Sequence, residues 1–191
     1  MNNFLLGVGL FGDDNILDAI SKTQGNFLEI GCLNGHHIYK VSKKFPDKII
    51  YGIDPFISDG HVGIPENIPL IEQKINLYKN IDGISNIKFF EMTTENFVTQ
   101  QQHNLADMNI SFIVIDGAHI FDFIKIDIDL AVSCITSNKW NAGTIVMDDI
   151  HIPDVVLANE YFLSLCKTNN IQLSNFRHTY TYYCYDVKVC Q

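Results

Sequence analysis

The sequence has little positive charge and no cluster of it. Its 191 residues contain 13 Lys and Arg against 22 Asp and Glu, which gives a formal net charge of −9. Nucleic-acid backbones and anionic membrane surfaces attract basic proteins, because their own charge is negative. We therefore expect no nucleic acid and no membrane among the partners of this protein.

Long apolar runs and patterned cysteines are also missing. No stretch approaches the roughly 20 apolar residues that a membrane-spanning helix needs. Residues 1–12 are apolar but contain no basic residue, and Gly7 and Gly9 interrupt them, so we expect no signal peptide. The five cysteines form neither a C-x-x-C pair nor a metal-ligand spacing. Free thiols and a cytoplasmic location are the expectation.

Apolar segments of two periodicities alternate along the chain. Runs typical of buried strands are followed by residues at helical spacing. The expected strands span residues 27–30, 49–53, 87–90, 110–115 and 144–147, with a terminal pair at 171–176 and 180–189. We predict one Rossmann-like α/β domain over residues 1–191, in which 1–25 form an N-terminal arm and helix. Its seven-stranded sheet is mostly parallel, with helices on both faces and an antiparallel C-terminal strand pair.

Two segments between the second and third expected strands carry further expectations. Residues 58–69 are rich in Gly and Pro, and we expect a loop long enough to close over a site. Ile71, Ile75 and Tyr78 lie at helical spacing and predict a helix with these residues on one face.

The segment 27–35 joins an apolar run to a glycine turn. Gly31 and Gly35 let the backbone bend and approach a ligand that a side chain would block. A helix that begins at Gly35 would aim its N-terminal amides at that ligand. Asp54 ends the next apolar run, where an acid accepts hydrogen bonds from ribose hydroxyls in nucleotide-binding folds. Together these residues predict a nucleoside-containing cofactor, and a merely structural turn is the alternative.

Acids also end two later strands. Asp116 follows residues 110–115, and Asp148 and Asp149 follow residues 144–147. If the two strands are neighbours, about 4.8 Å apart, these side chains converge. Converging carboxylates repel one another unless a cation neutralises them, and oxygen ligands favour Mg²⁺. The alternative is that Asp148 or Asp149 caps the following turn and Asp116 is an ordinary acid at a strand end.

Histidines close to these acids are candidates for proton transfer. His119 can act as a general base, since imidazole titrates near neutral pH, or it can cap the helix that follows. His151 is a second base, a substrate contact or an exposed residue, and we rank it below His119. Phe121, Phe123 and Tyr161 are expected in the core rather than as a platform for a substrate.

The order of these motifs resembles that of class I S-adenosylmethionine-dependent methyltransferases over residues 26–151. Within that class the sequence is similar to the group of catechol and macrocin-type sugar O-methyltransferases. The resemblance implies that the methionine part of S-adenosylmethionine binds at the glycine turn, the ribose at Asp54 and the adenine beside the two threonines. The residues assigned to the cofactor on this basis are Glu29, Gly31, Cys32, Gly35, Asp54, Thr93, Thr94 and Asp116.

The same resemblance implies a metal site and a reaction. Its Mg²⁺ ligands fall on Asp116, Asp148 and Asp149. His119 stands where the catechol enzymes have a lysine base, which leaves the substrate class open, and His37 stands where many relatives have serine. The implied function is a metal-dependent O-methyltransferase of a small hydroxylated substrate, in a family whose members are often homodimers. The rival class is a non-catalytic cofactor-binding or partner-binding protein.

Overall fold

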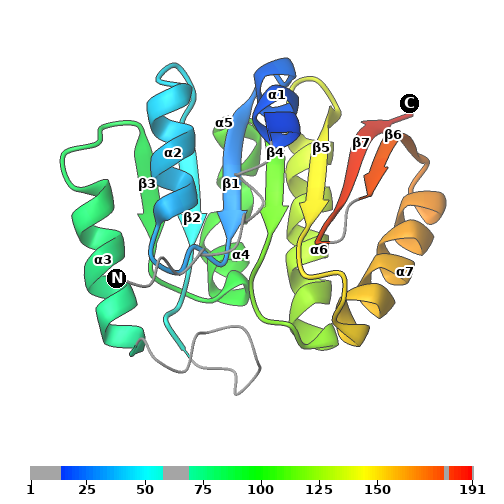
Figure 1. Cartoon of the computed structure of the whole chain (residues 1–191). Helices are drawn as coiled ribbons and strands as arrows, with labels where there is room; N and C mark the ends of the chain where they lie inside the picture. Colours follow the sequence, from blue (N-terminus) through cyan, green and yellow to red (C-terminus); the bar gives the residue numbers. More distant parts are fainter. Residues whose placement is uncertain (1–13, 58–68, 179–180, 191) are drawn as a thin grey trace.

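One twisted sheet organises the computed structural model, which describes residues 14–57, 69–178 and 181–190 (Figure 1). The sheet has seven strands in the order β3-β2-β1-β4-β5-β7-β6. The first five in sequence pair in parallel, and β7 runs antiparallel to both of its neighbours. The strands are β1 Asn26–Ile30, β2 Ile50–Ile53, β3 Ile87–Phe90, β4 Ile110–Ile115, β5 Ala142–Met147, β6 Ile171–His178 and β7 Tyr183–Val189.

Helices cover both faces of the sheet. One face packs against α1 Asp14–Lys22, α2 His36–Lys44 and α3 Leu70–Ile81 (Figure 1). The other packs against α4 Thr94–Gln101, α5 Leu105–Met108, α6 Phe121–Ser137 and α7 Pro153–Thr168, with the short 3-10 helix η2 Gln102–Asn104 between α4 and α5. This arrangement confirms the predicted fold class, down to the antiparallel C-terminal strand pair.

The central strands are buried on both faces because successive side chains point in opposite directions. In β1, Phe27 packs toward α1 and α2, whereas Leu28 and Ile30 pack toward α6. Phe27 stacks on Phe112 of the neighbouring β4, with ring centroids 5.8 Å apart. These strands therefore have continuous apolar sequences, because helices cover both of their faces.

Two segments differ from the sequence-based expectations. The helix predicted from Ile71, Ile75 and Tyr78 forms as α3, but those three side chains are 63%, 46% and 44% exposed, and Leu77 is buried instead. Residues 94–108 form α4, η2 and α5, which the sequence did not predict because their polar composition hides the periodicity. Residues 58–68 of the predicted loop and 1–13 of the predicted arm lie outside the described residues.

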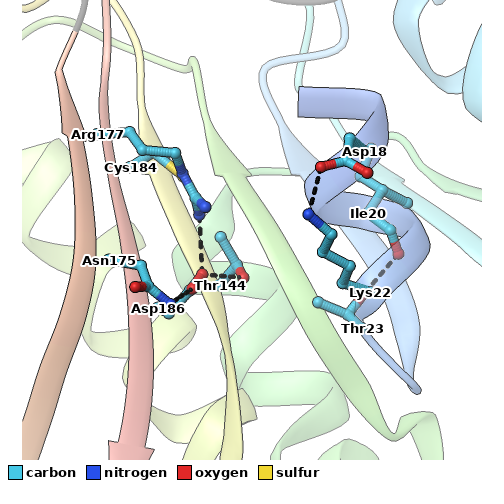
Figure 2. A network of polar contacts seen from close by, with 9 residues as sticks. All are labelled: Asp18, Ile20, Lys22, Thr23, Thr144, Asn175, Arg177, Cys184 and Asp186. Atoms are coloured by element: carbon cyan, nitrogen blue, oxygen red, sulfur yellow. Dashed lines mark hydrogen bonds and ion pairs between the residues drawn. The ribbon is translucent and has the colours of Figure 1, made fainter. Parts of the chain in front are cut away.

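Asp186 of β7 ties three strands together at the antiparallel side of the sheet (Figure 2). Its Oδ1 accepts hydrogen bonds from the Thr144 hydroxyl of β5 at 2.9 Å and from the Arg177 guanidinium of β6 at 2.8 Å. Its Oδ2 accepts from the Asn175 amide at 2.9 Å. The pairing of β6 with β7 shifts register between Ser174 and Arg177, so this carboxylate holds the edge strand where the regular ladder is interrupted.

Among the described residues, every helix falls short of the length and apolar character that crossing a membrane requires.

Candidate active site

A cavity of about 690 Å³ runs along the carboxyl ends of the parallel strands, at the lower edge of the sheet in Figure 1. Its walls are the segments that follow β1, β2, β3, β4 and β5, together with residues of α6. Ligands of open α/β sheets bind at this edge. Of the residues predicted to form the site, those that line the cavity are Gly31, Asp54, Thr93, Thr94, Asp116, His119, Asp148 and Asp149.

The glycine turn is built for close approach of the chain to itself. Gly31 has a φ of +88°, and a Cβ there would lie 2.0 Å from the Asp116 carbonyl oxygen. Gly35 has a φ of +73°, and its Cβ would lie 3.0 Å from the Leu77 side chain. The sequence predicted that glycine makes room for a ligand. In the structure it first makes room for the segment after β4 and for α3, which brings Asp116 to the turn.

Asp54 fixes the shape of this turn from the end of β2. Its Oδ2 accepts a hydrogen bond from the backbone N–H of Leu33 at 2.7 Å, and its Oδ1 accepts from the N–H of Phe56 at 2.7 Å. Burial raises the pKa of Asp54 in spite of these hydrogen bonds. Cys32 lies beneath the turn with its thiol directed at the carbonyl oxygens of Glu29 and Ile53, so the cysteine assigned to the cofactor does not line the cavity.

Glu29 and His37 form a pair at the α2 side of the cavity. The Glu29 side chain is fully buried, and its Oε1 lies 2.9 Å from Nδ1 of His37. Its Oε2 has no hydrogen-bond partner among the described residues. Burial lowers the pKa of His37, but the Glu29 carboxylate outweighs burial, and the pKa of His37 lies above its ordinary value. His37 therefore pairs with the buried acid of the turn, a contact that the sequence alone did not reveal.

Carboxylates gather where β4 and β5 end. Burial raises the pKa of Asp116 well above its ordinary value, and the carboxylates of Asp148, Glu29 and Asp149 raise it further. Burial also raises the pKa of Asp148 to about 6, and Oδ1 of Asp148 is buried without a partner among the described residues. Asp149 adopts a left-handed backbone conformation, with a φ of 55°. Residues in such conformations cluster at functional sites, because the surrounding structure must hold them there.

Two of the three predicted metal ligands, Asp116 and Asp149, are brought together with a histidine. Nε2 of His119 lies 2.9 Å from Oδ2 of Asp149, and this contact lowers the pKa of Asp149. Among the described residues, two groups of ligand atoms lie within 4.8 Å of one another, Asp116 with His119 and Asp149, and Asp116 with Glu29 and His37. Asp148 belongs to neither group. The sequence predicted ligands that are all carboxylate oxygens. In the structure each group also contains an imidazole nitrogen, from His119 or from His37.

The two candidate bases differ in position. The His119 side chain is 14% exposed and lines the cavity. The His151 side chain is 67% exposed, does not line the cavity, and lies with Nδ1 3.8 Å from Oδ1 of Asp149. Of the two, the geometry places His119 at the site.

Aromatic side chains form the outer wall. Phe123 is 50% exposed and lines the cavity with Phe56 and Ile57, so its assignment to the core was wrong. Phe121 and Tyr161 do pack against the core, with their rings edge to face at 6.4 Å. Phe123 precedes the buried Ile124 in α6, but its own side chain is half exposed. Helical spacing alone did not distinguish the two positions.

Asp127 of α6 is a cavity residue that sequence reasoning missed. It is 3% exposed, and the Thr94 side chain hydrogen-bonds to its carboxyl. Thr93 serves a different purpose, since its hydroxyl caps α4 by accepting from the backbone N–H of Asn96 at 3.3 Å. The signal for Asp127 was available, because position 127 falls three residues after Ile124 on the apolar stripe of the helix. An acid on such a stripe is buried and needs a reason.

No protein-family model matches the chain, and no curated protein matches its sequence. Solved structures do match. CalS11, a calicheamicin methyltransferase, has a TM-score of 0.62 at 14% identity, covering 90% of this chain and 76% of that one. The plantazolicin methyltransferase BpumL in complex with SAH has a TM-score of 0.57 at 15% identity, covering 92% and 80%. A precorrin-6y C5,15-methyltransferase from Geobacter metallireducens has a TM-score of 0.54 at 14% identity, covering 90% and 87%.

Identities this low show the fold alone. The chain has the Rossmann-like fold of class I methyltransferases, as the order of its motifs predicted.

The buried acid of α6 makes a testable contribution to stability. Burial raises the pKa of Asp127 from 3.8 to about 7. Between these values the folded chain keeps a proton that the unfolded chain has lost, so the free energy of unfolding falls as the pH rises through that window. Asp127→Asn has no such proton. We expect the free energy of unfolding of the variant to equal that of the wild type near pH 4 and to be higher by up to about 4 kcal/mol at pH 8.

Urea denaturation at pH 4, 5, 6, 7 and 8 measures this difference. Asp122→Asn, at an exposed position of the same helix, is the matched control and should run parallel to the wild type. A difference between Asp127→Asn and wild type that stays constant over the whole range would contradict the assignment.

Proposed function

We propose that the protein is an S-adenosylmethionine-dependent O-methyltransferase that acts on a small hydroxylated molecule. The observation that carries the proposal is the single cavity that connects the two halves of such a site. Asp54 and Thr94 line one part of it, and Asp116, His119 and Asp149 line another. The fold is shared with CalS11, whose structure is also described as a TDP-rhamnose 3′-O-methyltransferase.

The turn after β1 and the acid after β2 hold the methyl donor in this proposal. S-adenosylmethionine supplies a methyl group on a sulfonium centre. Asp54 accepts from the ribose hydroxyls with the acceptor capacity that Leu33 and Phe56 leave on its carboxylate. Thr94 lines the same cavity and contacts the adenine in this proposal. Glu29, Cys32 and Gly35 do not line the cavity, so we propose that they shape the site around the methyl donor without lining the cavity.

His119 takes the proton of the acceptor hydroxyl. Its imidazole faces the cavity, and Asp149 at 2.9 Å orients the ring and stabilises the imidazolium that forms. Phe56 and Phe123 line the same cavity and offer apolar surface to the substrate in this proposal. Positioning of the hydroxyl against the methyl donor supplies much of the rate enhancement in a displacement of this kind.

The acids near His119 are the proposed ligands of a divalent cation. The carboxyl of Asp116 has a pKa well above the ordinary value partly because other carboxylates face it, and Oδ1 of Asp148 is buried without a partner among the described residues. Both features are relieved by a cation. We propose that Asp116, Asp148 and Asp149 hold Mg²⁺. The ion would supply charge neutralisation and a lower pKa for the acceptor hydroxyl.

Binding of the methyl donor tests the first half of the proposal. Isothermal titration calorimetry should show that S-adenosylmethionine binds the wild type and that Asp54→Ala lowers the affinity at least about tenfold, because charge-assisted hydrogen bonds are lost. Asp82→Ala, at an exposed position beyond the end of α3, is the control and should bind as the wild type does. Equal affinities for Asp54→Ala and wild type would remove Asp54 from the site.

Metal removal tests the second half. In the presence of a chelator we expect methyl transfer to stop, and S-adenosylmethionine binding to persist, since the acids at the ends of β4 and β5 then repel the substrate oxygens. Transfer to a panel of catechols, sugars and flavonoids is followed before and after addition of Mg²⁺. Undiminished transfer in chelator would exclude the metal role, and cofactor binding without transfer to any acceptor would favour the non-catalytic alternative.

Substitution of each histidine tests which one is the base. His119→Ala should lower kcat by about 100-fold or more, the usual contribution of a positioned general base, with little change in KM for S-adenosylmethionine. His151→Ala is the matched control, because it removes an exposed imidazole near the same aspartate. A larger loss for His151→Ala than for His119→Ala would reverse the assignment.

A further inference from the structure

Asp127 is a buried acid that the proposed chemistry does not use. It lies in the second turn of α6, 3% exposed, on the wall of the cavity. The acids expected to bind metal follow β4 and β5, whereas Asp127 lies beside Thr94 at the start of α4. It lies where α4 and α6 pack against each other, between Thr94 and Gly117.

The carboxyl of Asp127 faces an opening that glycine maintains. A Cβ at Gly117 would lie 3.2 Å from Oδ2 of Asp127, tighter than an ordinary contact, and Gly117 lines the same cavity. Because residue 117 is glycine, no side chain at that position covers the Asp127 carboxyl. A carboxylate offers about four lone-pair sites, and the Thr94 hydroxyl occupies one of them.

A nucleoside whose ribose bound Asp54 would have its base within the same cavity as Thr94 and Asp127. Asp54 ends β2, and Thr94 follows β3, the next strand of the sheet. The wall between Thr94 and Gly117 carries Asp127 as its buried charged group. Burying a carboxyl costs free energy unless hydrogen-bond donors compensate it. A donor on the base would therefore form a favourable hydrogen bond with the Asp127 carboxyl.

We infer that Asp127 selects the base of the methyl donor, its carboxyl accepting a hydrogen bond from the exocyclic amino group of adenine. The inference rests on the proposed function, because it assumes a nucleoside in the cavity. It makes Asp127 a residue that determines specificity for the base of the methyl donor. A 6-oxopurine presents an oxygen in place of the amino group, and two acceptors facing each other in a buried site are unfavourable.

Two nucleoside probes test the inference directly. S-adenosyl-L-homocysteine carries the amino group, and S-inosyl-L-homocysteine carries an oxygen at the same position. By calorimetry at pH 8, we expect the wild type to prefer the adenosyl probe at least about tenfold. In Asp127→Asn the amide can rotate and present either its oxygen or its NH₂ group, so the preference should narrow to within about threefold.

Asp122→Asn makes the same change of charge at an exposed position of α6 and should keep the wild-type ratio. An unchanged ratio in Asp127→Asn would overturn the inference and leave the proposed function standing. Equal binding of the two probes by the wild type would do the same, and this measurement needs no variant to fold. Failure of both probes to bind the wild type would overturn the proposed function and the inference with it.

Discussion

Repulsion among clustered carboxylates is the constraint on which this site depends. Gly31 allows the segment after β4 to touch the turn after β1, and this contact carries Asp116 toward Glu29. Asp148 and Asp149 arrive from the next strand of the sheet. An imidazole contacts two of these acids, His37 at Glu29 and His119 at Asp149. Carboxyls whose pKa values are raised, as those of Asp116 and Asp148 are, cluster at functional sites.

The fold and the chemistry are supported by different observations. The sheet order and the likeness to solved methyltransferases establish a class I architecture, and a fold by itself does not fix a reaction. The proposal of O-methylation depends on the residues at the carboxyl ends of the strands. In that proposal Asp54 and Thr94 serve the cofactor, whereas His119 and Asp149 serve the acceptor, and the parallel sheet is what places all four on one cavity.

Helical periodicity identified helices better than it identified their buried faces. The α3 helix forms where Ile71, Ile75 and Tyr78 predict it, yet their side chains are largely exposed and Leu77 reaches the core. In α6 a polar residue is buried and an apolar one is exposed: Asp127 lies on the apolar stripe, and Phe123 is half exposed at the cavity. Packing against the sheet decides which face of a helix is buried. The spacing of apolar residues within the helix does not fix that face by itself.

The sequence by itself determined the strands, the glycine turn and the acids at the strand ends, because these depend on local apolar runs, on backbone freedom at Gly31 and on position along one strand. The tertiary structure decided which side chains meet. The pairing of His37 with Glu29, of His119 with Asp149 and of Asp127 with Thr94 joins residues from separate elements. Such contacts depend on strand order, helix rotation and side-chain conformation, and these are settled only when the whole core packs.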